Sequence, residues 1–165
     1  MKSNKGAAAA GLIIYIASFL LICSVIAVIT TFFYNNNKYL SSEATSAAEY
    51  DILNVYLANE AKTDGNSVVS VSTSETDEMD ENGGNFVICQ VDFESGNSYI
   101  FNEKDKTIYL KNIIKNKYFV LCNYIEINRN EENKKIPMFT KGATNFSVNL
   151  KILGKVYTQT YNFGN

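Results

Sequence analysis

The chain lacks histidine and tryptophan altogether, and its 165 residues include one proline and three cysteines. Without histidine, the sequence excludes catalytic triads that use imidazole as the base and metal sites that use imidazole as a ligand. Three scattered cysteines are too few for a zinc cluster. The net charge of −2 gives no basic excess for binding nucleic acid. We therefore expect no catalytic residue, no cofactor and no metal, and we expect that the protein is not an enzyme.

Charge is also missing from residues 6–37, and most of this stretch is apolar. Leu12–Tyr34 reads LIIYIASFLLICSVIAVITTFFY. About 20 apolar residues suffice to cross the hydrocarbon core of a bilayer, whereas the apolar region of a cleaved secretory signal has about 7–15. The segment therefore predicts a retained transmembrane helix. Lys2 and Lys5 precede it, so the positive-inside rule predicts a cytoplasmic N-terminus and an extracytoplasmic C-terminal domain.

The start of the apolar run has an unusual form, because a short basic leader ends in glycine immediately before it: Lys5 and Gly6 precede AAAAG. This pattern resembles the leader of type IV pilins and type II secretion pseudopilins. The resemblance implies that a prepilin peptidase cleaves between Gly6 and Ala7 and then methylates the new N-terminus. It also implies a leader peptide over residues 1–6 and a transmembrane, filament-core helix over residues 7–34.

Two positions depart from the family pattern. The first mature residue would be Ala7, where the family usually has a bulky residue, and the fifth would be Gly11, where the family usually has glutamate. In the family that glutamate is thought to pair with the N-terminus of a neighbouring subunit. Its replacement by Gly11 suggests a subunit that enters filaments at low copy number.

The region after the membrane segment continues as a predicted amphipathic helix over residues 35–62. Apolar residues recur there at spacings near three and four and indicate a helical face that packs against another element. This predicted stripe consists of Leu40, Ala44, Ala47 or Ala48, Ile52, Val55 and Tyr56. A helix that is apolar all round and then one-sided matches the plan of a pilin.

Residues 63–85 are rich in small polar and acidic side chains and predict an acidic polar loop, with a short strand at Ser67–Ser72 as an option. From residue 86 the apolar period changes to two, which indicates β-strands. Tyr118–Ile127 predicts one longer strand, and residues 145–152 alternate strictly between apolar and polar. We therefore predict an α+β, pilin-like fold in which a long N-terminal helix packs on an antiparallel β domain over residues 86–165.

Two of the cysteines, Cys89 and Cys122, fall on predicted strands outside the membrane. An extracytoplasmic location permits a disulfide. If their strands are neighbours, one bridge between them can form; the alternative is two separately buried thiols. Both alternatives stay open at the level of the sequence.

The overall layout resembles a minor pilin or pseudopilin, of the J type of type II secretion or the ComG type of competence systems. The resemblance implies a non-catalytic filament subunit whose partners are other pilins, the prepilin peptidase, an inner-membrane assembly platform and membrane lipid. Nucleic acid would be involved only indirectly, in competence. The alternative is an uncleaved, single-pass membrane anchor that carries an extracytoplasmic binding or sensor domain.

Overall fold

The computed structural model describes residues 5–79 and 85–164, with side chains from Ala9 onward. Within these described residues, one α-helix, α1 (Lys5–Lys62), precedes nine β-strands. The fold is α+β, with a long N-terminal apolar helix followed by antiparallel sheets on which the helix packs, as the sequence predicts. The chain divides into two compact units between Ser42 and Glu43, so the first unit holds most of α1 and the second holds its last five turns and all the strands.

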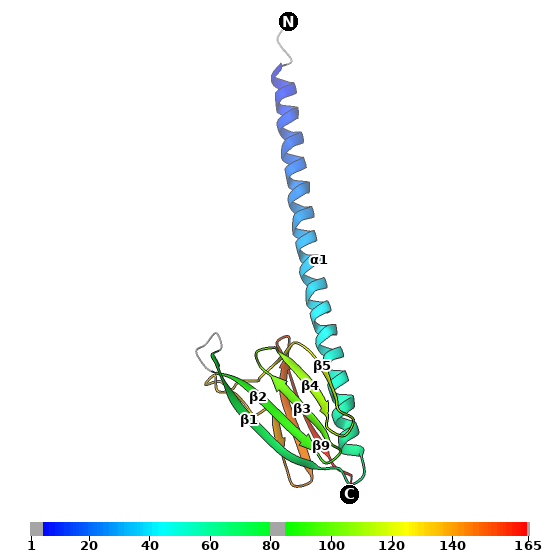
Figure 1. The fold of residues 1–165 in the computed structure, drawn as a ribbon. Coiled ribbons are helices and arrows are strands. Elements are labelled where there is room, and N and C mark those ends of the chain that lie inside the picture. Colours follow the sequence, from blue (N-terminus) through cyan, green and yellow to red (C-terminus); the bar gives the residue numbers. More distant parts are fainter. Residues whose placement is uncertain (1–4, 80–84, 165) are drawn as a thin grey trace. The chain divides into compact units, whose positions relative to one another are not determined.

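The strands form two sheets rather than one. In the first sheet five strands are paired in chain order: β1 (Val68–Met79), β2 (Asn85–Phe93), β3 (Asn97–Asn102), β4 (Thr107–Asn112) and β5 (Lys117–Cys122). Every pairing is antiparallel, and Figure 1 shows these strands side by side with β1 and β5 at opposite margins. Such a meander needs only short turns.

The second sheet is organised around β8 (Asn145–Ile152). Its whole length pairs with β9 (Lys155–Asn162), and its other edge pairs with two short strands, β6 (Ile125–Glu126) and β7 (Phe139–Lys141). Leu153 and Gly154 both have positive φ and form the two-residue turn between β8 and β9, a turn class that matches the twist of a hairpin. Strict alternation makes β8 half buried, with Phe146, Val148, Leu150 and Ile152 inside.

The predicted acidic loop over residues 63–85 is corrected by the structure, because β1 occupies residues 68–79 of it. The strand begins as the short Ser67–Ser72 option suggested but continues to Met79. Its pairing with β2 holds this exposed, polar sequence in an extended conformation, so tertiary pairing outweighs the weak strand propensity of the acidic residues. Residues 80–84 of the predicted loop lie outside the described residues.

The predicted long strand Tyr118–Ile127 is also corrected, because it divides into β5 and β6 in different sheets. Tyr124 has a φ of 60°, a left-handed conformation that breaks the extended chain between the two strands. Because of this break, one apolar stretch of sequence supplies a strand to each of the two sheets.

Aromatic side chains connect the two sheets in the core of the second unit. Phe146 of β8 lies 5.1 Å from Phe93 of β2, 4.8 Å from Tyr161 of β9 and 5.5 Å from Phe163, measured between ring centroids. Leu53 and Leu57 of α1 are buried in the same core. The last turns of the helix and both sheets therefore share one hydrophobic core.

Candidate functional site

The first unit presents an apolar helical surface. Every described side chain from Ala9 to Ser41 is exposed, and the run is long and apolar enough to cross a membrane by length and composition. Two hydroxyl groups in it are satisfied inside the helix, since Ser24 Oγ donates to Leu21 O at 2.7 Å and Thr31 Oγ1 donates to Ala27 O at 2.9 Å. Hydroxyl groups that are hydrogen-bonded to their own helix are suited to an apolar environment that cannot hydrogen-bond to them.

The predicted leader positions lie at the start of this helix. Gly6 and Ala7 fall within the first turn of α1, which begins at Lys5. At Gly11 an added Cβ atom would meet nothing within 4 Å. Packing within the chain therefore does not require glycine at this position, and a larger residue would fit.

The helix segment of the second unit buries a different face from the one predicted. Ala44 and Ala48 are exposed, and Ile52, Val55 and Tyr56 are 43%, 56% and 38% exposed. We call these five residues the outer stripe. Leu40 of the predicted stripe is exposed as well, and Ala47 is half-buried. The prediction that this stripe packs on the sheet is therefore wrong.

The buried face was missed because it carries polar groups that are fully hydrogen-bonded. Ser46 Oγ donates to Ile152 O at 3.0 Å and lies 2.9 Å from the Tyr157 hydroxyl. The Tyr50 ring stacks on Tyr157 at 4.2 Å, and Asn54 Oδ1 accepts from the Tyr161 hydroxyl at 2.7 Å. A search for apolar residues at helical spacing takes polar residues such as these to face solvent. In the structure the sheet supplies their hydrogen-bond partners, and these partners make their burial favourable.

A buried carboxylate fixes the end of the helix to the first sheet. Glu60 accepts hydrogen bonds from Asn66 Nδ2 at 2.7 Å, Ser95 Oγ at 2.7 Å, Tyr99 OH at 3.1 Å and Asn97 Nδ2. Burial, and next the Glu60 charge, raise the pKa of Tyr99 far above its ordinary value, so this phenol stays a donor. Glu60 lies outside the predicted apolar stripe, and its donors lie 6–39 residues away in the sequence, beyond any local pattern.

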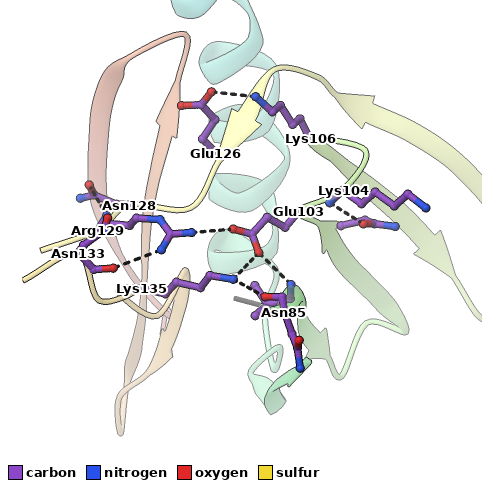
Figure 2. Close-up of polar contacts among 11 residues, drawn as sticks. Asn85, Glu103, Lys104, Lys106, Glu126, Asn128, Arg129, Asn133 and Lys135 are labelled. Atoms are coloured by element: carbon purple, nitrogen blue, oxygen red, sulfur yellow. Dashed lines mark hydrogen bonds and ion pairs between the residues drawn. The ribbon is translucent and has the colours of Figure 1, made fainter. Parts of the chain in front are cut away.

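A hollow of about 500 Å³ lies between the β3–β4 turn, β6 and the loop that follows β6. Its lining includes four cations and two carboxylates: Lys104, Lys106, Arg129, Lys151, Glu103 and Glu126. Figure 2 shows how these charges oppose one another: Glu103 faces Arg129 and Lys135, and Glu126 faces Lys106.

The centre of this cluster is Glu103, whose side chain is only 12% exposed. Its Oε2 accepts from Lys135 Nζ and from the backbone N–H of Val87, at 2.7 Å and 2.9 Å, and its Oε1 lies 3.5 Å from Arg129. Lys135 also donates to the Asn85 carbonyl at 2.6 Å. These contacts hold the loop between β6 and β7 against the start of β2, which is a structural role.

The two strand cysteines are free and buried, so of the two alternatives that the sequence left open the structure has the separate thiols. The register places Cys89, Phe101, Ile108 and Cys122 in one row across β2, β3, β4 and β5. Three strand spacings, roughly 14 Å, separate the ends of this row, whereas a disulfide needs Cα atoms within about 7 Å. The condition for a bridge, that the strands be neighbours, is not met.

We predict that both thiols resist alkylation at pH 8 while the protein is folded. Burial, and next the Glu49 carboxylate, raise the pKa of the Cys122 thiol to about 12, and burial raises the pKa of Cys89. A pKa of about 12 leaves roughly a thousandth of the thiolate of an ordinary cysteine at that pH. Iodoacetamide labelling followed by mass spectrometry should modify both cysteines in urea without reductant, and neither in buffer. Failure to label in urea without reductant would indicate a disulfide.

The same shift has a consequence for alkaline stability. Above about pH 9 the unfolded thiol loses its proton and the folded thiol keeps it, so the unfolded state binds fewer protons. The contribution of Cys122 to stability is therefore complete below about pH 9 and is lost as the pH rises toward 12.

Among the residues that the structure describes, no group of three or more histidine, cysteine, aspartate or glutamate side chains could hold a metal ion. The acidic residues Glu75, Asp77 and Glu78 lie along β1 rather than in a coordinating loop. The arrangement of the described residues is thus one of surfaces and structural clusters.

No family model, no curated protein and no solved structure matches the chain.

Proposed function

We propose that the protein is a non-catalytic minor pilin or pseudopilin subunit of a type IV pilus-like, competence or type II secretion filament. A prepilin peptidase cleaves it after Gly6, and its N-terminal helix then carries it into the filament. Before assembly it spans the membrane once, with the second unit on the extracytoplasmic side. Its partners are other pilins, the peptidase, the assembly platform and lipid.

The outer stripe is the observation that carries this proposal. A simple membrane anchor needs apolar surface only over the bilayer span, whereas Ile52, Val55 and Tyr56 extend exposed apolar surface into the helix segment of the second unit. Exposed apolar surface along a helix favours contact with another protein. In a filament, the helices of neighbouring subunits would cover both the membrane run and this stripe.

The leader pattern supports the same proposal from the other end of the helix. Lys2 and Lys5 precede Gly6, and the apolar run follows without interruption. The helix itself is continuous, because α1 runs unbroken from Lys5 to Lys62, through the three consecutive asparagines at 35–37. A continuous helix would carry the membrane run and the helix segment of the second unit into a filament as one element.

The N-terminus of the mature protein tests the proposal. In cells that contain a prepilin peptidase, mass spectrometry should find a chain that begins at Ala7, with or without a methyl group. Gly6→Leu should block cleavage and leave the leader attached, because the leader pattern requires a small residue there. Gly11→Ala is the matched control and should be cleaved normally, since an added Cβ at Gly11 meets nothing within 4 Å.

An intact N-terminus in the unsubstituted chain would contradict processing. It would favour the alternative function, an uncleaved single-pass anchor for a binding or sensor domain. Recovery of the protein in sheared surface filaments separates the two further, because an anchored protein would remain with the membrane.

A further inference from the structure

The sheet edges that the described residues form differ in how they are protected. A free edge offers unpaired backbone N–H and C=O groups to another strand, and proteins protect such edges with charge, bulges or short strands. β7 has only three residues, and β9 presents polar side chains such as Thr158 and Gln159. β7 is protected by its shortness, and the polar side chains of β9 give a partner strand little apolar surface.

The β1 edge is protected at both ends of the strand. At its start, Lys141 Nζ donates to the Val69 carbonyl at 3.2 Å, and β7 lies against the strand. Toward its end, Glu75, Asp77 and Glu78 are charged, and the register with β2 shifts between Glu75 and Met79. Charge and irregularity together make this margin a poor template for a further strand.

The β5 edge is different. Within the described part of the chain, β5 pairs only with β4. Its first four residues are all exposed, and Tyr118, Phe119 and Val120 are 60%, 39% and 49% exposed. No proline interrupts these residues, and the register shift with β4 lies beyond them, at the Cys122 end.

The surroundings of β5 add apolar surface and positive charge. Ile113 and Ile114, in the turn before β5, are among the most exposed apolar side chains of the second unit, and the Tyr118 ring stacks on Tyr109 of β4 at 5.2 Å on one face of the sheet. Three lysines lie at the same end of the sheet: Lys111, Lys115 and Lys117. The edge thus combines an open backbone, apolar side chains and a basic end.

We propose that Lys117–Val120 is a docking site for an extended strand of a partner protein, which carries apolar side chains and acidic residues and adds to the first sheet beyond β5. Main-chain hydrogen bonds would give the affinity for the added strand, and the exposed apolar side chains and the lysines would give the specificity. The acidic residues of the partner are expected opposite Lys117 and its neighbours. The sheet would then have six strands.

A second copy of the same chain, paired antiparallel, does not fit this edge. Two copies paired antiparallel through β5 would be related by a twofold axis perpendicular to the sheet. Because the helix segment of the second unit packs on the sheets, that axis would point the two segments in opposite directions. This step alone rests on the proposed function, in which all copies are inserted in one membrane in the same direction.

The test uses the full chain in detergent micelles and an eight-residue peptide of alternating valine and threonine with glutamate at both ends. Amide hydrogen exchange measured by NMR should slow for Lys117–Val120 when the peptide is added and should remain unchanged for β1 and β9. A peptide with lysine at both ends should bind at least fivefold more weakly. Added salt should weaken binding of the glutamate peptide, as expected for exposed charges.

Two variants complete the test. Val120→Glu places a negative charge on the open edge, where it repels the glutamate peptide, and should abolish the protection, whereas the matched control Val156→Glu on β9 should leave it intact. Equal binding of the two peptides, protection at another edge, or no protection would overturn the proposal. Protection of the β5 amides without peptide, in a concentration-dependent dimer, would show a second copy there and would also overturn it. None of these outcomes depends on cleavage after Gly6.

Discussion

Phe146→Ala is expected to destabilise the second unit by about 3–5 kcal/mol, the usual range for removing a buried aromatic ring. Phe146 is 1% exposed, and its ring contacts Phe93, Tyr161 and Phe163. The substitution leaves a cavity where the two sheets meet, and neither sheet can close it without giving up its own pairing. The free energy of unfolding from urea titration, followed by far-UV circular dichroism, measures the effect.

Tyr118→Ala serves as the matched control. It also removes an aromatic ring from a strand, but Tyr118 is 60% exposed and its main aromatic contact is Tyr109 on the surface. Its expected cost is about 1 kcal/mol or less. If the two variants unfolded at the same urea concentration, Phe146 would not be the link between the sheets.

Glu60→Ala is expected to cost about 2–4 kcal/mol, because it leaves several buried donors without their acceptor. The amide groups of Asn66 and Asn97 lose their carboxylate partner, as do the hydroxyls of Ser95 and Tyr99. An unsatisfied buried polar group costs about 1–3 kcal/mol, and the two hydroxyls can rotate toward other acceptors. The effect should appear in urea unfolding and as faster amide exchange in the β2–β3 turn.

Glu43→Gln is the control for the loss of a carboxylate on the same helix. Glu43 pairs with Lys155 at 3.3 Å, and both side chains are about half exposed. Surface pairs of this kind contribute about 0–1 kcal/mol. A Glu60→Ala protein as stable as Glu43→Gln would show that the donors find other partners, and that Glu60 does not hold the helix end in place.

The parts of the fold that could be predicted are those set by local sequence. The alternation of Phe146, Val148 and Leu150 defined β8, and the uncharged run over residues 6–37 defined the first part of α1. Both signals come from residues that are neighbours in sequence, and each pattern stays the same along the whole element. For such segments the hydrophobic pattern is a sufficient guide.

The parts that could not be predicted depend on partners distant in sequence. The face of α1 that packs carries Ser46 and Asn54, whose hydrogen-bond partners Tyr157 and Tyr161 lie more than 100 residues away. The acidic β1 is a strand because β2 pairs with it, and Tyr124 divides an apolar run that reads as one strand. The Glu60 cluster and the Glu103 cluster assemble from separate turns and were missed for the same reason.

The position of Tyr124 between the two sheets has a consequence for biogenesis. The first sheet is a meander of consecutive strands, and its last pairing is complete once Cys122 is available. The second sheet cannot begin until β8 exists, since β6 has no partner strand before that point. Topologies with local contacts form faster than those with distant ones. During synthesis the five strands of the first sheet can therefore pair while the aromatic core is still open, because that core is completed only when β8 and β9, residues 145–162, are available.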